Sequence, residues 1–486
     1  METDCVLAID QSTSGTKALI IDGKGKIIAR SDKSHEQKIS SQGWVSHDPV
    51  EIYRNTITVV RELTGMPGVD AGKICCIALS NQRETALVWD KISGKPLADA
   101  VVWQCARGEA ICDALSTHAG EIKTKTGLRL SPYFSAAKIA WILQNTPNKG
   151  SGKLCAGTMD SWLIYTLTGN FKTDFSNASR TQLFNIRSLS WDKDICTHFG
   201  INVDFLAEVC DSNSDFGVTD FDGVLPKKVP IRGVMGDSHA ALFGQGCLEK
   251  GMVKATYGTG SSVMVNIGEK PLFCENVVTS LAWGMNGTVH YVLEGNINYT
   301  GAVIKWLKDD VRLIASSKEA GVLAASANPE DTCYLVPAFS GLGAPHWKSE
   351  ARAILCGMTR TTGKAEIVRA AEESIAYQIA DVIQSIHEES GIPIKELRGD
   401  GGPTRDTYLM QFQSDILNIP LSIPEYEELS AIGSGFMAGI AVGLYGPGII
   451  NEVGRKRYDP KMDAASREKH YQGWREAVQL AIGSRV

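Results

Sequence analysis

Two similar strand-turn-strand units, one in each half of the chain, constrain the fold more than any other feature of the sequence. The apolar residues 6–9 run into a polar turn at residues 10–17, and residues 252–255 run into a glycine-rich turn at residues 256–262. A second apolar segment follows each turn at once, so each unit is predicted to be a hairpin. Turns of this composition point backbone N–H groups and small hydroxyls at one spot, which favours an anion, and glycine allows a close approach. Both turns are therefore predicted to hold phosphate.

A second similarity supports a duplication. Each half carries a later apolar segment that ends in Gly-Asp, at Gly236-Asp237 and at Gly399-Asp400. Taken singly, such turns and strand ends are more often ordinary hairpin loops than ligand sites. Because both kinds recur at matching places in two halves, we expect two similar lobes that face each other and close on a nucleotide.

Length and composition limit the classes of protein that fit. A chain of 486 residues is too long for one core, so two or three domains are expected, and the duplication favours two. With 43% hydrophobic and 21% charged residues the chain is typical of a soluble globular protein. The net charge of -6 argues against a nucleic-acid partner or an anionic membrane surface. The twelve cysteines show no metal-ligand spacing, so reduced and mostly buried thiols are expected.

Two segments bear on the location of the protein. Residues 1–4 are acidic and lead directly into the first strand, so no signal peptide is predicted and a cytoplasmic location is expected. Residues 431–445 form the most apolar stretch of the chain. Its small residues and the following Pro447 favour a tightly packed helix in the core of the second lobe over membrane insertion.

The order of segments predicts an α/β fold. The first half opens with strands and then alternates helix-like and strand-like segments, which is typical of a mixed central sheet. Residues 74–79 form an apolar strand that delivers residues 81–84 at its carboxyl end. Ligands bind at that edge in open α/β sheets.

Ordered motifs along nearly the whole chain resemble the FGGY family of carbohydrate kinases, and within it the glycerol kinases most closely. The motifs are residues 10–17, 81–85, 102–104, 132–145, 236–237, 257–260, 336–347 and 353–373. In the last of them, Glu372 stands where the family pattern expects an apolar residue. The resemblance implies two actin-like, ribonuclease H-like lobes of the hexokinase, Hsp70 and actin superfamily, with a cleft between them.

The resemblance also implies how the lobes divide the work. Residues 1–246 are expected to form the N-terminal lobe, with the acceptor site, the catalytic base and the first phosphate turn. Residues 247–486 are expected to form the C-terminal lobe, which binds the nucleotide. ATP and Mg²⁺ are the implied cofactors and a small polyol or sugar is the implied substrate. A homodimer or a homotetramer is compatible with the family.

Three residues are the catalytic candidates. An alcohol is a poor nucleophile at neutral pH, so a kinase needs a carboxylate that takes the hydroxyl proton. Asp237 matches the general base of the family, although it is also placed to cap a helix. Asp10 lies at the first phosphate turn, where a carboxylate can bind Mg²⁺ directly or through water. Lys17 stands where glycerol kinases often have arginine and would neutralise charge in the transition state, the alternative being a solvated strand residue.

The acceptor candidates are led by Arg83 and Glu84, which are adjacent after a strand. Arginine donates to hydroxyl oxygens and glutamate accepts from hydroxyl hydrogens, so together they can read a diol. Trp103 offers an apolar wall and Tyr133 a hydroxyl contact, although aromatic residues at such positions are more often core. The resemblance adds Asp237, Ser238 and Ser262 to this group.

The nucleotide candidates come from both phosphate turns and the second lobe. The resemblance places Thr13 and Ser14 at the transferred phosphoryl group. It places the remaining contacts at Gly258, Thr259, Gly301, Lys305, Gly401, Gly402 and Asp406. Lys305 replaces a common glutamine and Asp406 replaces an asparagine near the adenine. Neither change removes a catalytic group, so altered nucleotide contacts are expected rather than lost activity.

Two acceptors are compatible with the sequence, glycerol and a longer polyol or ketose. Ser238 and Ser262 replace larger residues of glycerol kinases, which would make room for a four- or five-carbon polyol or ketose such as erythritol, erythrulose or xylulose. The pair Arg83 and Glu84 is retained, which favours phosphorylation of glycerol to glycerol 3-phosphate. A non-kinase ATPase of the actin or Hsp70 type would need no acceptor pocket, so the same pair and Asp237 argue against it.

Overall fold

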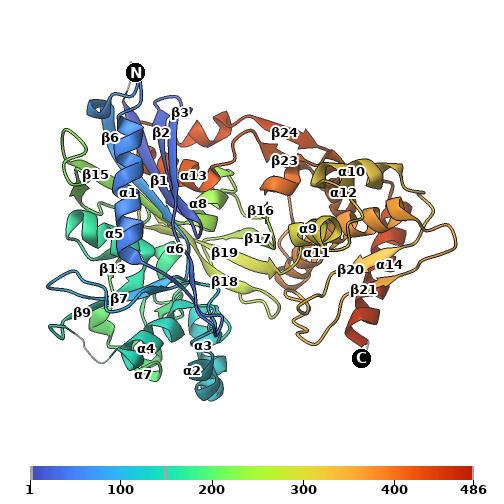
Figure 1. The fold of residues 1–486 in the computed structure, drawn as a ribbon, viewed down its shortest axis with the longest axis horizontal. Helices are drawn as coiled ribbons and strands as arrows, with labels where there is room; N and C mark the ends of the chain where they lie inside the picture. The colour runs from blue at the N-terminus through green and yellow to red at the C-terminus, as the bar shows by residue number, and fades with distance from the viewer. Residues whose placement is uncertain (1–3, 147–149, 484–486) are drawn as a thin grey trace.

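Two open sheets form the framework of the molecule (Figure 1). The computed structural model describes residues 4–146 and 150–483. The first sheet has the order β3 (Ile27–Ser34), β2 (Gly15–Asp22), β1 (Cys5–Gln11), β6 (Ile74–Asn81), β15 (Val229–Gly236), β14 (Val218–Thr219). The second has the order β18 (Val278–Met285), β19 (Thr288–Ile297), β17 (Ser261–Gly268), β16 (Met252–Tyr257), β22 (Glu396–Asp400), β23 (Leu421–Pro424), β24 (Arg455–Tyr458).

The two sheets share one topology. β1 pairs antiparallel with β2 and parallel with β6, and β16 pairs antiparallel with β17 and parallel with β22. The flanking pairs follow the same pattern, because β2 and β3 match β17 and β19, and β15 and β14 match β23 and β24. The predicted α/β fold with two similar lobes is therefore confirmed.

The second similarity inferred from the sequence is wrong. β15 ends at Gly236 and β22 ends at Asp400, but the matched strand orders make β22 the counterpart of β6. The counterpart of β15 is β23, which ends in Pro424 without a Gly-Asp pair. A Gly-Asp pair marks the end of a strand locally, whereas equivalence depends on the order in which strands pair. In the sequence the two hairpins are therefore the only valid sign of the duplication, whereas in the structure the shared strand order establishes it.

Helices cover both sheets. The α-helices are α1 (Pro49–Thr64), α2 (Glu109–Ala114), α3 (Ala119–Thr126), α4 (Ser135–Asn145), α5 (Met159–Thr168), α6 (Phe175–Ala178), α7 (Lys193–His198), α8 (Asp237–Gly244), α9 (Gly301–Asp309), α10 (Ser317–Ser326), α11 (Lys364–Ser390), α12 (Thr407–Leu417), α13 (Leu429–Ala441) and α14 (Ala464–Gly483). α1 packs on β2 and β3, and α11 packs on their counterparts β17 and β19. In Figure 1 the first sheet with α1 lies at the left, and α9 to α12 and α14 lie at the right.

The apolar helix α13 is buried, as predicted, but its predicted place in the core of the second lobe is wrong. It packs against α8 and against β1, β6 and β15 of the first sheet. Its small residues allow very close contact, because a Cβ added at Gly433 would lie 1.8 Å from the carbonyl oxygen of Ala240. The helix follows β23 in the chain, so the second half of the sequence covers one face of the first sheet.

The segments between the framework strands form smaller units. A third sheet has the order β4 (Lys38–Ile39), β5 (Val45–His47), β8 (Ala100–Val101), β7 (Ala86–Asp90), β9 (Leu154–Thr158). Two-stranded ribbons pair β10 (Lys172–Asp174) with β13 (Glu208–Cys210), β11 (Phe184–Asn185) with β12 (Ser190–Trp191), and β20 (Tyr334–Val336) with β21 (Ile354–Cys356). The 3₁₀ helices are η1 (Ala71–Lys73), η2 (Ser116–His118), η3 (Val203–Phe205), η4 (Gly402–Arg405) and η5 (Pro447–Glu452).

Two further expectations concern thiols and membranes. All twelve cysteines lie in the described part of the chain, carry free thiols and are buried or half-buried. Within residues 4–146 and 150–483, no helix combines the length and the apolar character needed to cross a bilayer.

Candidate active site

The loop after β6 brings Arg83 and Glu84 to the same side of the chain. A regular strand would send the two side chains to opposite faces. Here Glu84 has a left-handed φ of 59°, and the N–H of Thr85 donates to the carbonyl oxygen of Arg83 at 2.7 Å. As a result, Nε of Arg83 lies 3.9 Å from Oε1 of Glu84. Such backbone strain in a non-glycine residue costs about 1–3 kcal/mol and is concentrated at functional sites.

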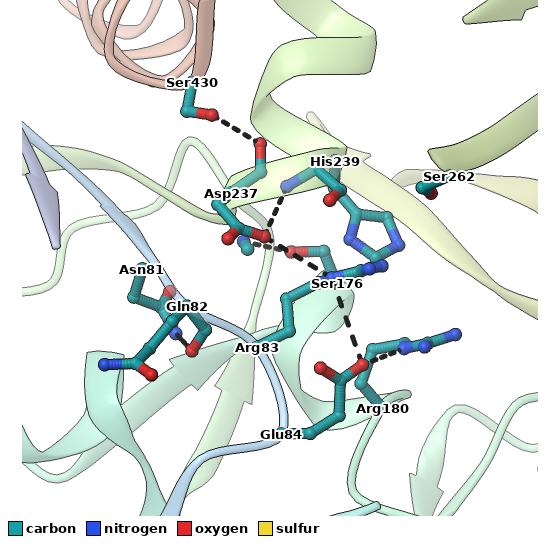
Figure 2. A network of polar contacts seen from close by, with 12 residues as sticks. Asn81, Gln82, Arg83, Glu84, Ser176, Arg180, Asp237, His239, Ser262 and Ser430 are labelled. Atoms are coloured by element: carbon teal, nitrogen blue, oxygen red, sulfur yellow. Dashed lines mark hydrogen bonds and ion pairs between the residues drawn. The ribbon is translucent and has the colours of Figure 1, made fainter. Parts of the chain in front are cut away.

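Asp237 lies beside this pair, at the start of α8 (Figure 2). Its Oδ1 lies 3.4 Å from Nε of Arg83 and accepts a hydrogen bond of 2.6 Å from the N–H of Ser238. The hydroxyl of Ser430, at the start of α13, donates to the carbonyl oxygen of Asp237 at 3.0 Å. The N-cap of α8 is Gly236 and no side chain caps the helix, so Asp237 does not cap it as the sequence allowed. Its carboxylate instead faces the first turn of the helix and a cation. Its side chain remains 32% exposed, so it is open to a substrate.

Arg83 and Glu84 belong to a buried network of four charged side chains. Arg83 donates through both Nη atoms to Glu294, at 2.9 and 2.8 Å. Nε of Arg180 donates to Oε1 of Glu84 at 2.5 Å, and its Nη1 lies 2.9 Å from Oε2 of Glu294. Neither Nη of Arg180 has a well-aligned hydrogen-bond acceptor among the described residues. The two arginines hold the pKa of Glu294 well below its usual range despite its burial.

Sequence reasoning missed three residues of this site. Arg180 directly follows a polar run at residues 174–179, and Glu294 is a lone charged residue in the buried part of β19. His239 follows the motif that carries Asp237, and its ring is fully buried with Nδ1 lacking a partner within the described structure. A buried charge inside an apolar strand is the one sequence signal that could have identified Glu294.

Asp10 is the penultimate residue of β1, directly before the first turn, and its carboxylate is close enough to Asp237 to sense its charge. The hydroxyl of Ser80 donates to its Oδ1 at 2.8 Å, and Lys17 is its partner across the β1–β2 pair. The pKa of Asp10 is raised to about 6, mainly by removal of the carboxylate from water. The negative charge of Asp237 also raises this pKa, whereas the hydrogen bond from Ser80 and the charge of Lys17 lower it. The structure thus brings together both predicted catalytic carboxylates and the predicted lysine.

The phosphate turn is tied to the aromatic residues of the acceptor group. Nε1 of Trp103 donates to the hydroxyl of Thr13 at 3.0 Å, and the rings of Trp103 and Tyr133 are 5.7 Å apart. Nε2 of His35 lies 3.0 Å from the carbonyl oxygen of Thr13, and burial lowers the pKa of His35 to about 4. The ring is therefore neutral and can donate to that carbonyl. Ser14, at the tip of the turn, is exposed.

The loop that carries Tyr133 is fastened by a buried lysine. Nζ of Lys138 donates to the carbonyl oxygens of Pro132, Tyr133 and Phe134. Three carbonyls use all three donors of an ammonium group. Burial lowers the pKa of Lys138 to about 7 and also raises the pKa of the Tyr133 hydroxyl.

The two serines predicted at the acceptor end of the site differ in their surroundings. The hydroxyl of Ser262, in β17, donates to Oε1 of Glu294 at 3.0 Å and so belongs to the charged network. Ser238 lies in the first turn of α8 and is half-buried. The neighbouring Ser261 donates to the hydroxyl of Thr300 at 2.9 Å. Residues 261 and 262 therefore connect the acceptor group to the second phosphate turn.

The second phosphate turn packs against the start of α9. The N–H of Gly301 donates to the carbonyl oxygen of Gly258 at 2.9 Å, and the N–H of Ala302 donates to that of Thr259 at 3.0 Å. A Cβ at Gly301 would lie only 2.5 Å from the oxygen of Gly258, so the contact requires glycine. Lys305 lies further along α9 and is exposed.

The remaining nucleotide candidates surround η4. Gly401 has φ 100°, and a Cβ there would lie 2.0 Å from the carbonyl oxygen of Tyr257, so its backbone is pressed against the end of β16. Gly402 is exposed with open space around it. Asp406 caps α12, where Oδ1 accepts from the N–H groups of Tyr408 and Leu409. This capping role was not predicted from the sequence.

Two lobes of one topology, with one carboxylate beside the first turn and another directly after β15, have the arrangement expected of a phosphoryl-transfer enzyme. The model of the N-terminal domain of the FGGY family of carbohydrate kinases matches residues 5–244, and the model of the C-terminal domain matches residues 253–442. The chain belongs to the FGGY family of carbohydrate kinases. It is accordingly an ATP-dependent carbohydrate kinase.

Similar proteins support this assignment over the full length. Glycerol kinase 1 of Thermotoga maritima is 48% identical over 491 residues, covering 98% of this chain and 99% of that protein. A glycerol kinase of Xanthomonas euvesicatoria is 41% identical over 500 residues, covering 100% of both. The crystal structure of Plasmodium falciparum glycerol kinase with ADP has a TM-score of 0.93 and 35% identity, covering 99% of both chains. The xylulose kinase of Lactobacillus acidophilus, at 21% identity and a TM-score of 0.88, shares the fold.

Proposed function

We propose that this protein transfers the γ-phosphoryl group of ATP to a primary hydroxyl of a small polyol, with glycerol as the first candidate and glycerol 3-phosphate as its product. The observation that carries the proposal is the convergence of Arg83, Glu84 and Asp237, which a left-handed residue at position 84 makes possible. The relatives that match the whole chain at 41–48% identity are named glycerol kinases, which supports glycerol.

Asp237 is the proposed general base. Its partly exposed carboxylate accepts the proton of the attacking hydroxyl as the bond to phosphorus forms. Nε of Arg83 and the N–H of Ser238 both face Oδ1, which leaves Oδ2 for the substrate. The acceptor is proposed to be held by the donors of Arg83 that do not face a carboxylate. Three of the five N–H donors of Arg83 face carboxylates, so two are left for substrate oxygens.

The residues around Asp10 fit a bound magnesium ion. A half-buried carboxylate with a raised pKa, bonded by one hydroxyl and facing one lysine, is a group whose ionised form a cation would stabilise. We propose that Asp10 holds Mg²⁺, which neutralises charge on the phosphates when it is bound. Lys17 adds a second positive charge, and Thr13 and Ser14 bind the transferred group.

The nucleotide is proposed to bind the second lobe. Gly258 and Thr259 would hold phosphates through the turn, and Gly301 allows α9 to approach it. Gly401 and Gly402 are proposed near the base and ribose and Asp406 near the adenine, while Lys305 lines the neighbouring helix α9. The division at residue 246 into an acceptor lobe, 1–246, and a nucleotide lobe, 247–486, remains part of this proposal. The close packing of Gly301 on Gly258 and of Gly401 on Tyr257 supports the placement of the nucleotide at this turn, because only glycine lets these backbone segments lie so near it.

A four- or five-carbon polyol or ketose is the second candidate acceptor. Ser238 and Ser262 are short, and the buried Nδ1 of His239 has no partner in the described residues, which leaves a polar group for an additional substrate oxygen. Burial depresses the pKa of His239 well below its usual value, so the ring is neutral. A neutral imidazole can donate to or accept from a hydroxyl.

A substrate panel tests the proposal. ADP release is measured with ATP and Mg²⁺ for glycerol, erythritol, xylitol, erythrulose and xylulose at equal concentrations. The highest kcat/KM for glycerol supports the first candidate, and the highest value for a longer acceptor supports the second. ATP hydrolysis that is independent of all five acceptors would contradict both.

A further inference from the structure

Outside the active site, two histidines and a glutamate converge on the surface of the first half of the chain. His118 ends η2, Glu121 lies one turn later in α3, and His198 is the last residue of α7. Their ligand atoms all lie within 4.8 Å of one another. Oε2 of Glu121 lies 3.2 Å from Nε2 of His198 and 3.7 Å from Nδ1 of His118. None of the three contacts the residues assigned to catalysis or substrate binding.

This spacing matches the demands of a transition metal. In a tetrahedral site with Zn–N and Zn–O bonds of about 2.0–2.1 Å, neighbouring ligand atoms are roughly 3.3 Å apart. The two measured separations from Glu121 bracket that value, so small side-chain rotations would close the site. His118 precedes Glu121 by three residues at the start of one helix, which places both on the same face.

The surroundings leave one carboxylate oxygen of Glu121 for the ion. Nζ of Lys125 lies 2.8 Å from Oε1 of Glu121 and is shared with Asp192 and Asp194, at 3.2 and 3.0 Å. The other carboxylate oxygen of Glu121, Oε2, faces both imidazoles. The rings of His118 and His198 stack with centroids 3.9 Å apart and an angle of 27° between their planes. An imidazole binds a metal in its own ring plane, so one ring must rotate about its side-chain bonds before both nitrogens face the same ion. The side chains of the three residues are 23–39% exposed, which provides an entry path.

We propose that His118, Glu121 and His198 bind a divalent transition metal of the Zn²⁺ type, with water in the remaining position. Imidazole selects Zn²⁺, Cu²⁺ or Ni²⁺ over the oxygen-seeking Mg²⁺ of the catalytic site. The ion links α3 to α7, which are otherwise joined at this point by the Glu121–His198 hydrogen bond and the ion pairs of Lys125. The sequence gives little sign of the site, because His198 lies 77 residues from Glu121.

Cobalt binding tests the proposal with the full chain. Co²⁺ is titrated into the reduced protein at pH 7.5 and followed by visible absorption, together with equilibrium dialysis of Zn²⁺. We expect one ion per chain and a visible band without the sulfur charge-transfer band that thiol ligands produce. His118→Ala and His198→Ala should each weaken binding by about tenfold or more, because each removes one of three ligands.

Matched variants separate this site from other sources of binding. His387→Ala removes an exposed histidine at the end of α11 and should leave the affinity unchanged. Glu121→Gln keeps the shape of the side chain but removes its charge, and should weaken binding. Circular dichroism and kinase activity without added transition metal should be unchanged in all four variants, which shows that they fold. Absence of binding, a sulfur charge-transfer band, or equal affinity in the His118 and His387 variants would each overturn the proposal.

Discussion

The guanidinium group of Arg83 is bonded to both carboxylate oxygens of Glu294, at 2.9 and 2.8 Å. Arg83 follows β6 of the first sheet and Glu294 lies in β19 of the second, so this ion pair joins the two sheets directly. Both side chains are buried, at 6% and 1% exposure. The same arginine faces the proposed base, Asp237, through Nε. The contact between the two sheets therefore also positions the arginine that faces the proposed base.

Glu294→Gln tests the weight of this contact. The amide keeps the size of the side chain but leaves Arg83 and Arg180 buried without their shared negative charge. Removing one partner of a buried ion pair costs about 3–5 kcal/mol, so the free energy of unfolding should fall by that order and kcat/KM should also fall. Urea denaturation and steady-state kinetics measure both effects.

Ser262→Ala is the matched control for Glu294→Gln. It removes one hydrogen bond to the same carboxylate but leaves every charge in place, so a loss of about 1 kcal/mol is expected. If Glu294→Gln is as stable as the wild type, the network does not hold the lobes together.

Asp237→Asn tests the general base. The amide cannot take the hydroxyl proton, so kcat should fall by about 10²- to 10⁴-fold, with the affinity for ATP unchanged in equilibrium binding. Ser430→Ala serves as the control, because it removes a bond to the backbone of Asp237 without touching the carboxylate. Near-normal turnover of Asp237→Asn would rule out the assignment.

The pH dependence of activity should report Asp10. Its pKa is raised to about 6, so lowering the pH through this value protonates the carboxylate in the free enzyme and removes its affinity for Mg²⁺. We therefore expect kcat/KM at fixed, subsaturating Mg²⁺ to decline as the pH falls below about 6. Ser80→Ala removes a hydrogen bond that favours the ionised form, so the decline should begin at a higher pH. If kcat/KM falls over the same acidic pH range in the wild type and in Ser80→Ala, the decline is not caused by protonation of Asp10.

The sequence predicted those parts of the fold and site that depend on local pattern. Both hairpins and the strand predicted at residues 74–79, which the structure extends to Asn81, are encoded by short contiguous segments and were found where expected. The same holds for the position of Arg83 and Glu84 directly after that strand. Apolar runs and turn residues act over a few positions, so they can be recognised without knowing the tertiary structure.

The rest depended on which segments meet in space. Glu294 is 211 residues from Arg83, and nothing in the spacing of the two reveals their pairing. The helix α13 was correctly predicted to be buried, but its apolar sequence does not say which sheet it covers. The Gly-Asp pairs failed for the same reason, because strand order decides which strand ends are equivalent. Tertiary contact overrides local pattern in each of these cases.

Lys138→Met tests whether the buried lysine positions Tyr133. The thioether fills similar volume but donates no hydrogen bond, so three carbonyl oxygens at residues 132–134 lose their shared donor. The loop should loosen, and KM for the acceptor should rise while KM for ATP stays constant. Lys138→Arg keeps the donors and should restore part of the acceptor affinity. Equal increases in both KM values would indicate general destabilisation rather than a role at Tyr133.

The last prediction concerns substrate specificity at Ser238 and Ser262. If these serines enlarge the acceptor end of the site, Ser238→Gln with Ser262→Phe should favour glycerol and exclude longer polyols. A difference of one methylene-sized group usually changes kcat/KM by about 10- to 200-fold, which is the discrimination expected between glycerol and erythritol. Ser238→Gln alone is the cleaner variant, because Ser262→Phe also removes the hydrogen bond to Glu294. A wild-type enzyme that already prefers glycerol by a wide margin would show that neighbouring residues refill the space, and the two serines would then have no part in selecting the substrate.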